Sequence, residues 1–525
     1  MSRRIRATQE DPQRMEAQAI TVEKPFTAAE EKFTELVARL RTAESRRMTH
    51  SELESLIATE GREIHRRLLQ GHLDVRASEE QVQASVWGAD EVERTHHRRR
   101  GRGLLTVFGL VTAMRMTYGA RRHGSLSPLD ASLNLPEELH SHGLRRLAAV
   151  EAARGSFDAT VEAIERNTGT RLAKRQAEEL VGRAAQDFDA FYDRPESAEV
   201  AADERDLLVL SLDGKGIVMR REHLRQATRK ASDNAQHKLD HRLSKGEKRD
   251  RKRMATVAAV YDLTPQARGP EDVLAELRPV RDALKPRPRA QNKRVWASVE
   301  KSAEAVTSEV FEEARRRDPS CQRCWVVLVD GDRHQINRVR AEAKRRGMLR
   351  DVTLVVDFIH VLEYLWDAAW CFFDEGDKEA ERWVTERAFA ILQGRSSDVG
   401  AGIRRSATLR QLPPDKRIGA DDCANYLIAK RNMLRYHRYL RQGLPIATGV
   451  IEGACRHLIV DRLDITGARW SVRGAEAILR LRSLRSSGDF DDYWTFHLHA
   501  EHARNHASRY ATKPALRVIA GGASS

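Results

Sequence analysis

Apolar residues recur every three or four positions near the start of the chain. The stretch TAAEEKFTELVARLRTAESRR, residues 27–47, repeats this spacing, which predicts an amphipathic helix. Ser51 and Glu54 have the spacing of a capping box, so we expect another helix to begin there. The pattern therefore predicts that residues 1–95 form an N-terminal helical region.

The hydrophobic pattern changes between residues 96 and 136. A basic stretch, HHRRRGR from His96, leads into LLTVFGLVTAMRMTYGA, which is rich in β-type residues, and then into the turn-rich GSLSPLDASLNLP. Runs of this kind predict a short pair of strands. We interpret residues 96–136 as a basic β-type linker module.

Helical periodicity returns in residues 137–200. Within them, two amphipathic stretches in SFDATVEAIERNTGTRLAKRQAEELVGRAA are joined by NTGT. Two helices joined by a short turn are typical of a helix-turn-helix, whose second helix enters the DNA groove. We therefore predict a helix-turn-helix-like DNA-binding region in which Arg171, Lys174 and Arg175 face DNA. An ordinary helical hairpin is the alternative interpretation.

Strand patterns dominate from residue 206 and alternate with helical ones. The stretch DLLVLSLDGKGIVMR predicts a strand, a turn at residues 213–216 and a second short strand. The elements predicted after it are the strand MATVAAVYDLTP, a helix from about 295 to 316, the strand CWVVLVDGD, the helix QINRVRAEAKRRG and the strand DVTLVVDF. Three strands followed by helix, strand, helix and strand predict an α/β layer fold with a mixed sheet.

The rest of the chain has mainly helical periodicity. Residues 360–443 read as wholly helical and contain several aromatic residues that would supply a core. Helical spacing continues from Glu452 to about Arg504. Residues 506–525 form a C-terminal tail, and we expect its stretch TKPALRVIAGGASS to be loosely ordered.

Three carboxylates stand at the predicted ends of these elements. Asp213 follows the first strand of the α/β region, Asp330 follows the strand WVVLV, and Glu452 lies in TGVIEGACRHL at the start of a late helix. Each aspartate precedes a glycine, and Asp-Gly is also a common turn dipeptide, so a purely structural role is the alternative. Carboxylates that converge repel one another unless a cation neutralises them, and oxygen ligands suit Mg²⁺ or Mn²⁺. Two such ions about 4 Å apart could activate a water or a DNA 3′-hydroxyl group.

The charge of the chain favours a polyanionic partner. The formal net charge is +14 and the isoelectric point is about 9.7. Residues 220–253 hold thirteen Lys/Arg against five Asp/Glu, and such density predicts contact with a phosphate backbone. The candidate contacts at the end of this stretch are Arg249, Arg251, Lys252 and Arg253.

Other features limit the compartment and the class of protein. The longest apolar runs are too short to span a bilayer, and no secretory signal is visible, so we expect no membrane partner. The five cysteines are scattered, which argues for a reducing compartment and against a disulfide framework.

Several stretches of the chain resemble one family of DNA enzymes. They are LSLDGKGI, VLVDGD, VVDFIHVLEYLW, GVIEGACRHLIVDRLDITGARWS, GAEAILRLRSLRSSGDFDDYW, SFDATVEAIERNTG and RQAEEL. In their order along the chain they resemble bacterial insertion-sequence transposases of the ISKra group, from about Leu129 to His499. The resemblance implies a DDE enzyme, related to Mutator-like transposases, whose ribonuclease H-like core has a mixed five-stranded sheet with helices. The core would comprise residues 201–360 and 445–505, and residues 361–444 would be an all-α insertion.

The resemblance also implies the catalytic residues. Asp213 would be the first metal-binding aspartate and Glu452 the closing glutamate. The order of the elements favours Asp330 as the second aspartate, with Asp357 as its competitor and Asp332 as a further alternative.

His360 and Arg456 would support this triad. Asp357 and His360 match a family motif in which a cysteine or aspartate precedes a histidine by three residues. We treat His360 as a supporting site residue and Arg456 as a candidate phosphate contact, although a salt bridge is the simpler role for Arg456.

The hypothesis that follows is a transposase of the bacterial cytoplasm, associated with the nucleoid. It would bind terminal inverted repeats and target DNA as a dimer or higher oligomer, and two Mg²⁺ or Mn²⁺ ions would serve strand cleavage and strand transfer. A DNA-binding regulator without catalysis and a ribonuclease H-like nuclease without strand transfer are the alternatives.

Overall fold

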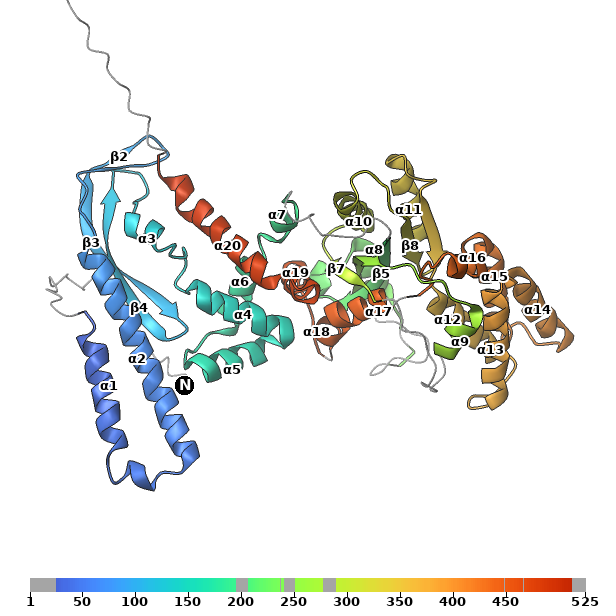
Figure 1. Ribbon diagram of the computed structural model, residues 1–525, viewed down its shortest axis with the longest axis horizontal. Coiled ribbons are helices and arrows are strands. Elements are labelled where there is room, and N and C mark those ends of the chain that lie inside the picture. The colour runs from blue at the N-terminus through green and yellow to red at the C-terminus, as the bar shows by residue number, and fades with distance from the viewer. Residues whose placement is uncertain are drawn as a thin grey trace, which may run out of the picture. The chain divides into compact units, whose positions relative to one another are not determined.

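The structure is a computed structural model that describes residues 25–194, 206–236, 238–239, 251–276, 289–447, 449–465 and 467–511. The chain divides into two compact units (Figure 1). The first contains the described residues up to Asp187 together with those from Trp494, and the second runs from Phe188 to Tyr493. Arg249 and the predicted tail beyond Ala511 lie outside the described residues.

Two long helices begin the first unit, as the hydrophobic pattern predicts. They are α1 (Thr27–Leu40) and α2 (His50–Ser78), and a short turn of 3₁₀-helix, η1 (Ser45–Arg47), lies between them. The predicted capping box at Ser51 and Glu54 is wrong. Thr49 is extended and caps α2 instead: its side chain accepts a hydrogen bond from the Glu52 N–H, and Glu52 accepts one from the Thr49 N–H at 2.7 Å. The helix therefore begins two residues earlier than its sequence signal suggested.

A β-hairpin follows, and it is longer than the predicted short pair of strands. The strands β3 (His96–Thr106) and β4 (Gly109–Gly119) are antiparallel and pair along their whole lengths. Leu73 of α2 packs with Leu104, Val111 and Ala113 of the hairpin in one buried cluster. The small strands β1 (Val86–Trp87) and β2 (Glu93–Arg94) precede the hairpin, and α3 (Pro128–Ser132) follows it.

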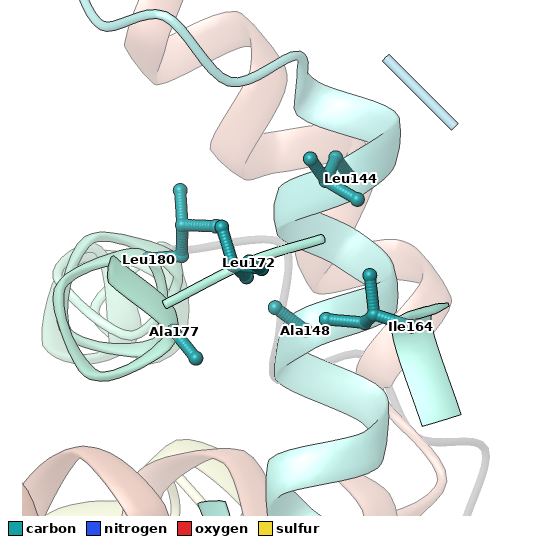
Figure 2. Packing of buried hydrophobic residues seen from close by; sticks show 6 residues of the cluster. All are labelled: Leu144, Ala148, Ile164, Leu172, Ala177 and Leu180. Carbon is teal, nitrogen blue, oxygen red and sulfur yellow. The ribbon is translucent and has the colours of Figure 1, made fainter. Parts of the chain in front are cut away.

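Three helices follow α3 and share a core of small and branched apolar side chains. They are α4 (His142–Arg154), α5 (Phe157–Thr168) and α6 (Lys174–Ala184). Figure 2 shows Leu144 and Ala148 of α4 facing Ile164 of α5 and Leu180 of α6. Gly169 ends α5 with a φ of +69°, a left-handed conformation that glycine adopts without strain. The turn that the NTGT stretch predicts therefore lies between α5 and α6.

The second unit contains a five-stranded mixed sheet with the order β7-β6-β5-β8-β9. Its strands are β5 (Leu207–Val218), β6 (Lys252–Leu263), β7 (Gln291–Ser298), β8 (Trp325–Val329) and β9 (Val352–Val356). The strands β5, β6 and β7 are antiparallel neighbours, whereas β8 and β9 are parallel to β5. The α/β class and the mixed sheet are therefore confirmed.

Two predicted boundaries inside the sheet are wrong. Residues 213–216 form no turn, because β5 continues through them and Asp213 pairs with Val257 of β6. The helix predicted from about residue 295 begins only at Ala303, because residues 295–298 pair with β6 as the end of β7. In both places pairing with β6 outweighs the local preference of the chain.

Helices make up most of the remainder of the second unit, in agreement with the pattern after residue 360. Those before the last strand are α7 (Phe188–Tyr192), α8 (Gln226–Asn234), α9 (Pro270–Glu276), α10 (Ala303–Arg317) and α11 (Arg333–Arg345). Those after it are α12 (Phe358–Ala369), α13 (Lys378–Leu392), α14 (Ser396–Leu409), α15 (Ile418–Lys430), α16 (Tyr436–Arg441), α17 (Val450–Ala454), α18 (Asp461–Leu463) and α19 (Val472–Ser487). Figure 1 shows α12 to α15 grouped together. The last helix, α20 (Phe490–Asn505), leads into the first unit, and no helix among the described residues is long and apolar enough to cross a membrane.

A buried ion pair links β6 to the segment just before β8. Arg323, just before β8, donates to Asp262 of β6 at 2.6 Å, and both side chains are almost fully buried. The guanidinium group also donates to the carbonyl oxygens of Asp206 and Leu207. Asp262 therefore neutralises a charge that has no access to solvent.

We predict that Asp262→Ala destabilises the second unit by about 3–5 kcal/mol, because it leaves the buried charge of Arg323 unpaired. Urea denaturation followed by tryptophan fluorescence would measure the change in the free energy of unfolding. The matched control is Asp421→Ala, which removes the more exposed pair between Asp421 and Arg417 and should change stability little. Equal effects of the two substitutions would contradict the prediction.

Candidate functional site

Three aspartates lie at about the same level of three adjacent parallel strands: Asp213 is in β5, and Asp330 and Asp357 come directly after β8 and β9. The pairing of β5 with β8 ends at Ser211 and Leu328, so two residues further on Asp213 lies beside Asp330. The pairing of β8 with β9 ends at Val329 and Val356, so one residue further on Asp330 lies beside Asp357. The two main candidates for the second aspartate are therefore neighbours at one edge of the sheet.

A buried glutamine from α11 fixes the separation of the first two strands. The Asp330 N–H donates to Gln335 Oε1 at 3.0 Å, and Gln335 Nε2 donates to the carbonyl oxygen of Leu212 at 2.8 Å. The Asp357 N–H in turn donates to the carbonyl oxygen of Val329 at 2.8 Å. The backbone at all three aspartates is thus held by hydrogen bonds.

Glu452 reaches the same place from α17. Gly449 precedes this helix with a φ of +68°, a left-handed conformation that explains the first glycine in TGVIEGACRHL. Cys455 begins the π-helical segment η5 (Cys455–Val460), and its thiol donates to Asp213 Oδ2 at 3.1 Å. Residues three apart share a helix face, and the charge of Glu452 acts on both Cys455 and Asp357, so Glu452 lies beside these acids.

Burial and like charge act on these acids together. Burial raises the pKa of Asp330, and the charge of Asp213 raises it further. Burial also raises the pKa of Asp357, to about 7, and the charge of Glu452 contributes to this shift. Burial raises the pKa of Cys455, and the charges of Asp213 and Glu452 add to it. Like charges therefore act between Asp213 and Asp330 and between Asp357 and Glu452, in a partly dehydrated place.

Both carboxylate oxygens of Glu452 are buried and have no hydrogen-bond partner among the residues that the structure describes. A buried carboxylate without a partner is costly, and several of them close together are more so. A divalent cation would relieve this cost, and the carboxylate oxygens present are the ligands that Mg²⁺ and Mn²⁺ prefer. The residues therefore fit such an ion.

The four carboxylates are nevertheless not drawn together as tightly as metal ligands. Within the described ranges, the one group with three ligand atoms all within 4.8 Å of one another is Asp187, His497 and Glu501, in the first unit. That buried group could hold a metal, but arginines already serve it: Arg145 donates to Glu501 at 2.7 Å and to His497 Nε2 at 2.9 Å. His497 Nδ1 also lies 2.7 Å from Asp187. A network so well satisfied is explained by its ion pairs alone.

The alternative aspartate Asp332 and the supporting residues His360 and Arg456 each have different neighbours. Asp332 caps α11 by accepting the Gln335 N–H at 2.8 Å, and its own N–H donates to Asp330 Oδ1 at 2.7 Å. His360 is hydrogen-bonded to Glu363 at 3.0 Å. Burial alone would lower the pKa of His360. The hydrogen bond and the charges of Glu363, Asp357 and Asp330 outweigh burial, so the pKa of His360 is raised. Arg456 is exposed and lies 3.6 Å from Asp461. Asp332 thus has a capping role, and His360 lies among the acids.

Sequence reasoning missed three residues that hold the site. Cys455 and Gln335 have been described, and the third is Tyr426 of α15, whose hydroxyl donates to the carbonyl oxygen of Asp330 at 2.8 Å. The ring of Tyr364 stacks on Tyr426 with 4.0 Å between ring centroids. The position of Cys455, three residues after Glu452, was a usable signal, whereas nothing in the helical pattern marks Tyr426.

The predicted DNA contacts are mainly on the surface. Arg171, Lys174 and Arg175 are exposed, and each pairs with a neighbouring acid at 2.7–3.2 Å. Exposed pairs of this kind are weak, so phosphate groups could replace the acids. Lys252 lies 3.0 Å from Asp464, and Arg253 donates to the carbonyl oxygen of Val299 at 2.9 Å. Arg251 is exposed just before β6.

No protein-family model matches the chain, and a search of curated proteins finds no significant match. Its function therefore has to be argued from the site.

We predict that Asp357 makes the second unit less stable as the pH rises from about 4 to about 7 in metal-free buffer. Below this range the carboxyl group is protonated in both the folded and the unfolded chain. Within it, the unfolded chain loses the proton while the folded chain keeps it, so folding is progressively penalised. Asp357→Asn should therefore gain stability relative to the unsubstituted chain as the pH rises, by an amount on the order of a few kcal/mol. Chemical denaturation in EDTA from pH 4 to 8 would measure this, and a difference independent of pH would contradict it.

Proposed function

We propose that the chain is a DDE transposase of an insertion sequence, with a ribonuclease H-like core that cleaves and joins DNA with the help of divalent metal ions. The observation that carries the proposal is the meeting of Asp213, Asp330 and Asp357 with Glu452, whose carboxylate oxygens are buried without a partner. The strand order β7-β6-β5-β8-β9, in which β5 is antiparallel to β6 and parallel to β8, supports this core.

The proposed triad is Asp213, Asp330 and Glu452. Asp330 is the acid whose pKa responds to the charge of Asp213, which favours it as the second member. Asp357 responds instead to Glu452, so we assign it as a fourth carboxylate beside the glutamate. When bound, divalent ions would activate a water or a 3′-hydroxyl group and stabilise the leaving oxygen of the phosphodiester.

Other residues of the chain orient these acids. The Gly214 N–H donates to Asp213 Oδ1 at 2.6 Å and the Cys455 thiol to Oδ2, so both oxygens of Asp213 have fixed directions. Tyr426 and Gln335 hold the backbone of Asp330. Lys215 lies two residues after Asp213, on the same face of β5. Burial and Asp213 raise the pKa of Cys455, and the charge of Lys215 offsets part of that rise. We assign Lys215 to a phosphate group of the DNA.

The basic surface supports DNA as the substrate. The exposed arginines and lysine at the start of α6 and before it would contact terminal inverted repeats, and the stretch before β6 would contact the backbone. Cleavage at two ends followed by joining would need a dimer or a higher oligomer on DNA. These parts of the proposal extend beyond the carboxylate site.

The test is cleavage of a plasmid that carries the coding segment with its flanking DNA. Asp330→Asn should lower Mg²⁺-dependent cleavage by at least about 100-fold, because it removes a proposed metal ligand, while mobility-shift assays should show unchanged DNA binding. Asp332→Asn is the matched control, two residues away; asparagine also caps helices, so cleavage should persist.

The outcomes separate the alternatives. Normal cleavage by Asp330→Asn with loss in Asp357→Asn would exchange the roles of these two residues. Binding without cleavage by the unsubstituted chain would support a regulator. A pre-cleaved end supplied with target DNA should yield a joined product, whereas a nuclease of the same fold would give none.

A further inference from the structure

A cationic pocket lies in the first unit, separate from the carboxylate site. It measures about 600 Å³ and is bordered by the hairpin β3–β4 and by the segment from Arg504 to Tyr510. Arg100, Arg102 and Arg115 enter it from the hairpin, and Arg504 and Arg509 from the C-terminal segment. Asp130 and Glu137 are the acids in its wall. The pocket therefore has an excess of positive charge.

The strand geometry concentrates three of these charges on one face. Arg100 and Arg102 are two residues apart on β3 and so share a face, and Arg115 of β4 is directly opposite Arg100. Like charges opposite one another in an antiparallel pair destabilise a sheet. Repulsion between these arginines therefore destabilises the hairpin, and a bound anion would reduce that repulsion.

Arg504 already pairs with Asp187 and Glu501, and the protein neutralises the other arginines of the pocket only in part. Asp130 is shared by Arg115 at 2.8 Å and Arg102 at 3.1 Å, so one carboxylate serves two guanidinium groups. Arg509 donates to the carbonyl oxygen of Ser125 at 3.0 Å, and Arg115 to that of Arg100 at 3.0 Å. Carbonyl oxygens orient a guanidinium group without cancelling its charge.

The positive charge continues outside the pocket along the strand. Residues 96–101 of β3 are all exposed, and Arg98 shares the face of Arg100 and Arg102. Alternate residues of a strand are spaced by about 7 Å, so these three form a row of cations. A row suits a chain of phosphate groups better than it suits one small anion.

We propose that this pocket and the row beside it bind the phosphate backbone of duplex DNA, as a contact distinct from α6. The choice of DNA as the polyanion rests on the proposed function. In this contact Arg100 and Arg509 bind phosphate groups directly, and Asp130 holds Arg102 and Arg115 in place.

The test is a salt titration of DNA binding with the full chain and a duplex from either end of the coding segment. The logarithm of affinity falls with the logarithm of salt concentration by about 0.9 per phosphate contact. The double variant Arg100→Gln/Arg509→Gln should bind more weakly, with a slope smaller by about 1 to 2. The lysine variant Arg100→Lys/Arg509→Lys should keep the slope, because it keeps both charges.

The matched control is Arg41→Gln/Arg47→Gln, which removes two exposed arginines of the same unit outside the pocket and should keep the slope. Thermal unfolding would show that all variants are folded. An unchanged slope in the glutamine variant of the pocket would overturn the proposal. Stabilisation by inorganic phosphate that DNA does not compete with would also overturn it, in favour of a small-anion site.

Binding is measured without cleavage, so the two proposals fail separately. A reduced slope in a chain that never cleaves DNA would leave the pocket assigned and refute the catalytic function. Cleavage by the unsubstituted chain, together with an unchanged slope in the glutamine variant, would refute the pocket assignment and leave the catalytic function in place.

Discussion

Asp213, Asp330 and Asp357 lie side by side because β5, β8 and β9 are parallel and in register at this edge of the sheet. The burial of these acids, with repulsion between Asp213 and Asp330 and between Asp357 and Glu452 of α17, is the constraint on which the site depends. Such a group persists only where the surrounding fold holds it in place or where bound cations neutralise it. The two unpartnered oxygens of Glu452 favour cations.

The surrounding fold contributes from several distant parts of the chain. Gln335 of α11 joins the ends of β5 and β8, and Tyr426 of α15 fixes the backbone of Asp330. Cys455 orients the carboxylate of Asp213. The helices between His360 and Gly443 are therefore more than a separate insertion, because Tyr426 connects one of them to the acids. An ion would then need to move only side chains, since the backbone is already fixed.

The sequence pattern predicted the α/β class, the alternation of helices with strands and the positions of the three strands β6, β8 and β9. It failed where pairing between distant segments decides the structure, as at residues 213–216, where two glycines suggested a turn inside β5, and at β7, which was taken for a helix. The acids could be chosen from the sequence because Asp213, Asp330 and Asp357 each follow a strongly apolar run and Glu452 lies at the start of a helix. Tyr426 and Gln335 could not, since Tyr426 contacts Asp330 and Gln335 contacts Leu212 from more than 90 residues away in the chain.

Binding of Mn²⁺ measured by titration calorimetry near pH 7.5 tests the central claim most directly. The account predicts binding that is lost or greatly weakened in Asp213→Asn and Glu452→Gln and that is unchanged in Asp187→Asn, which alters the other group able to hold a metal. Circular dichroism of each variant would show that the fold is intact. Binding that survives Glu452→Gln, or that disappears in Asp187→Asn, would contradict the assignment of the carboxylate site as the metal centre.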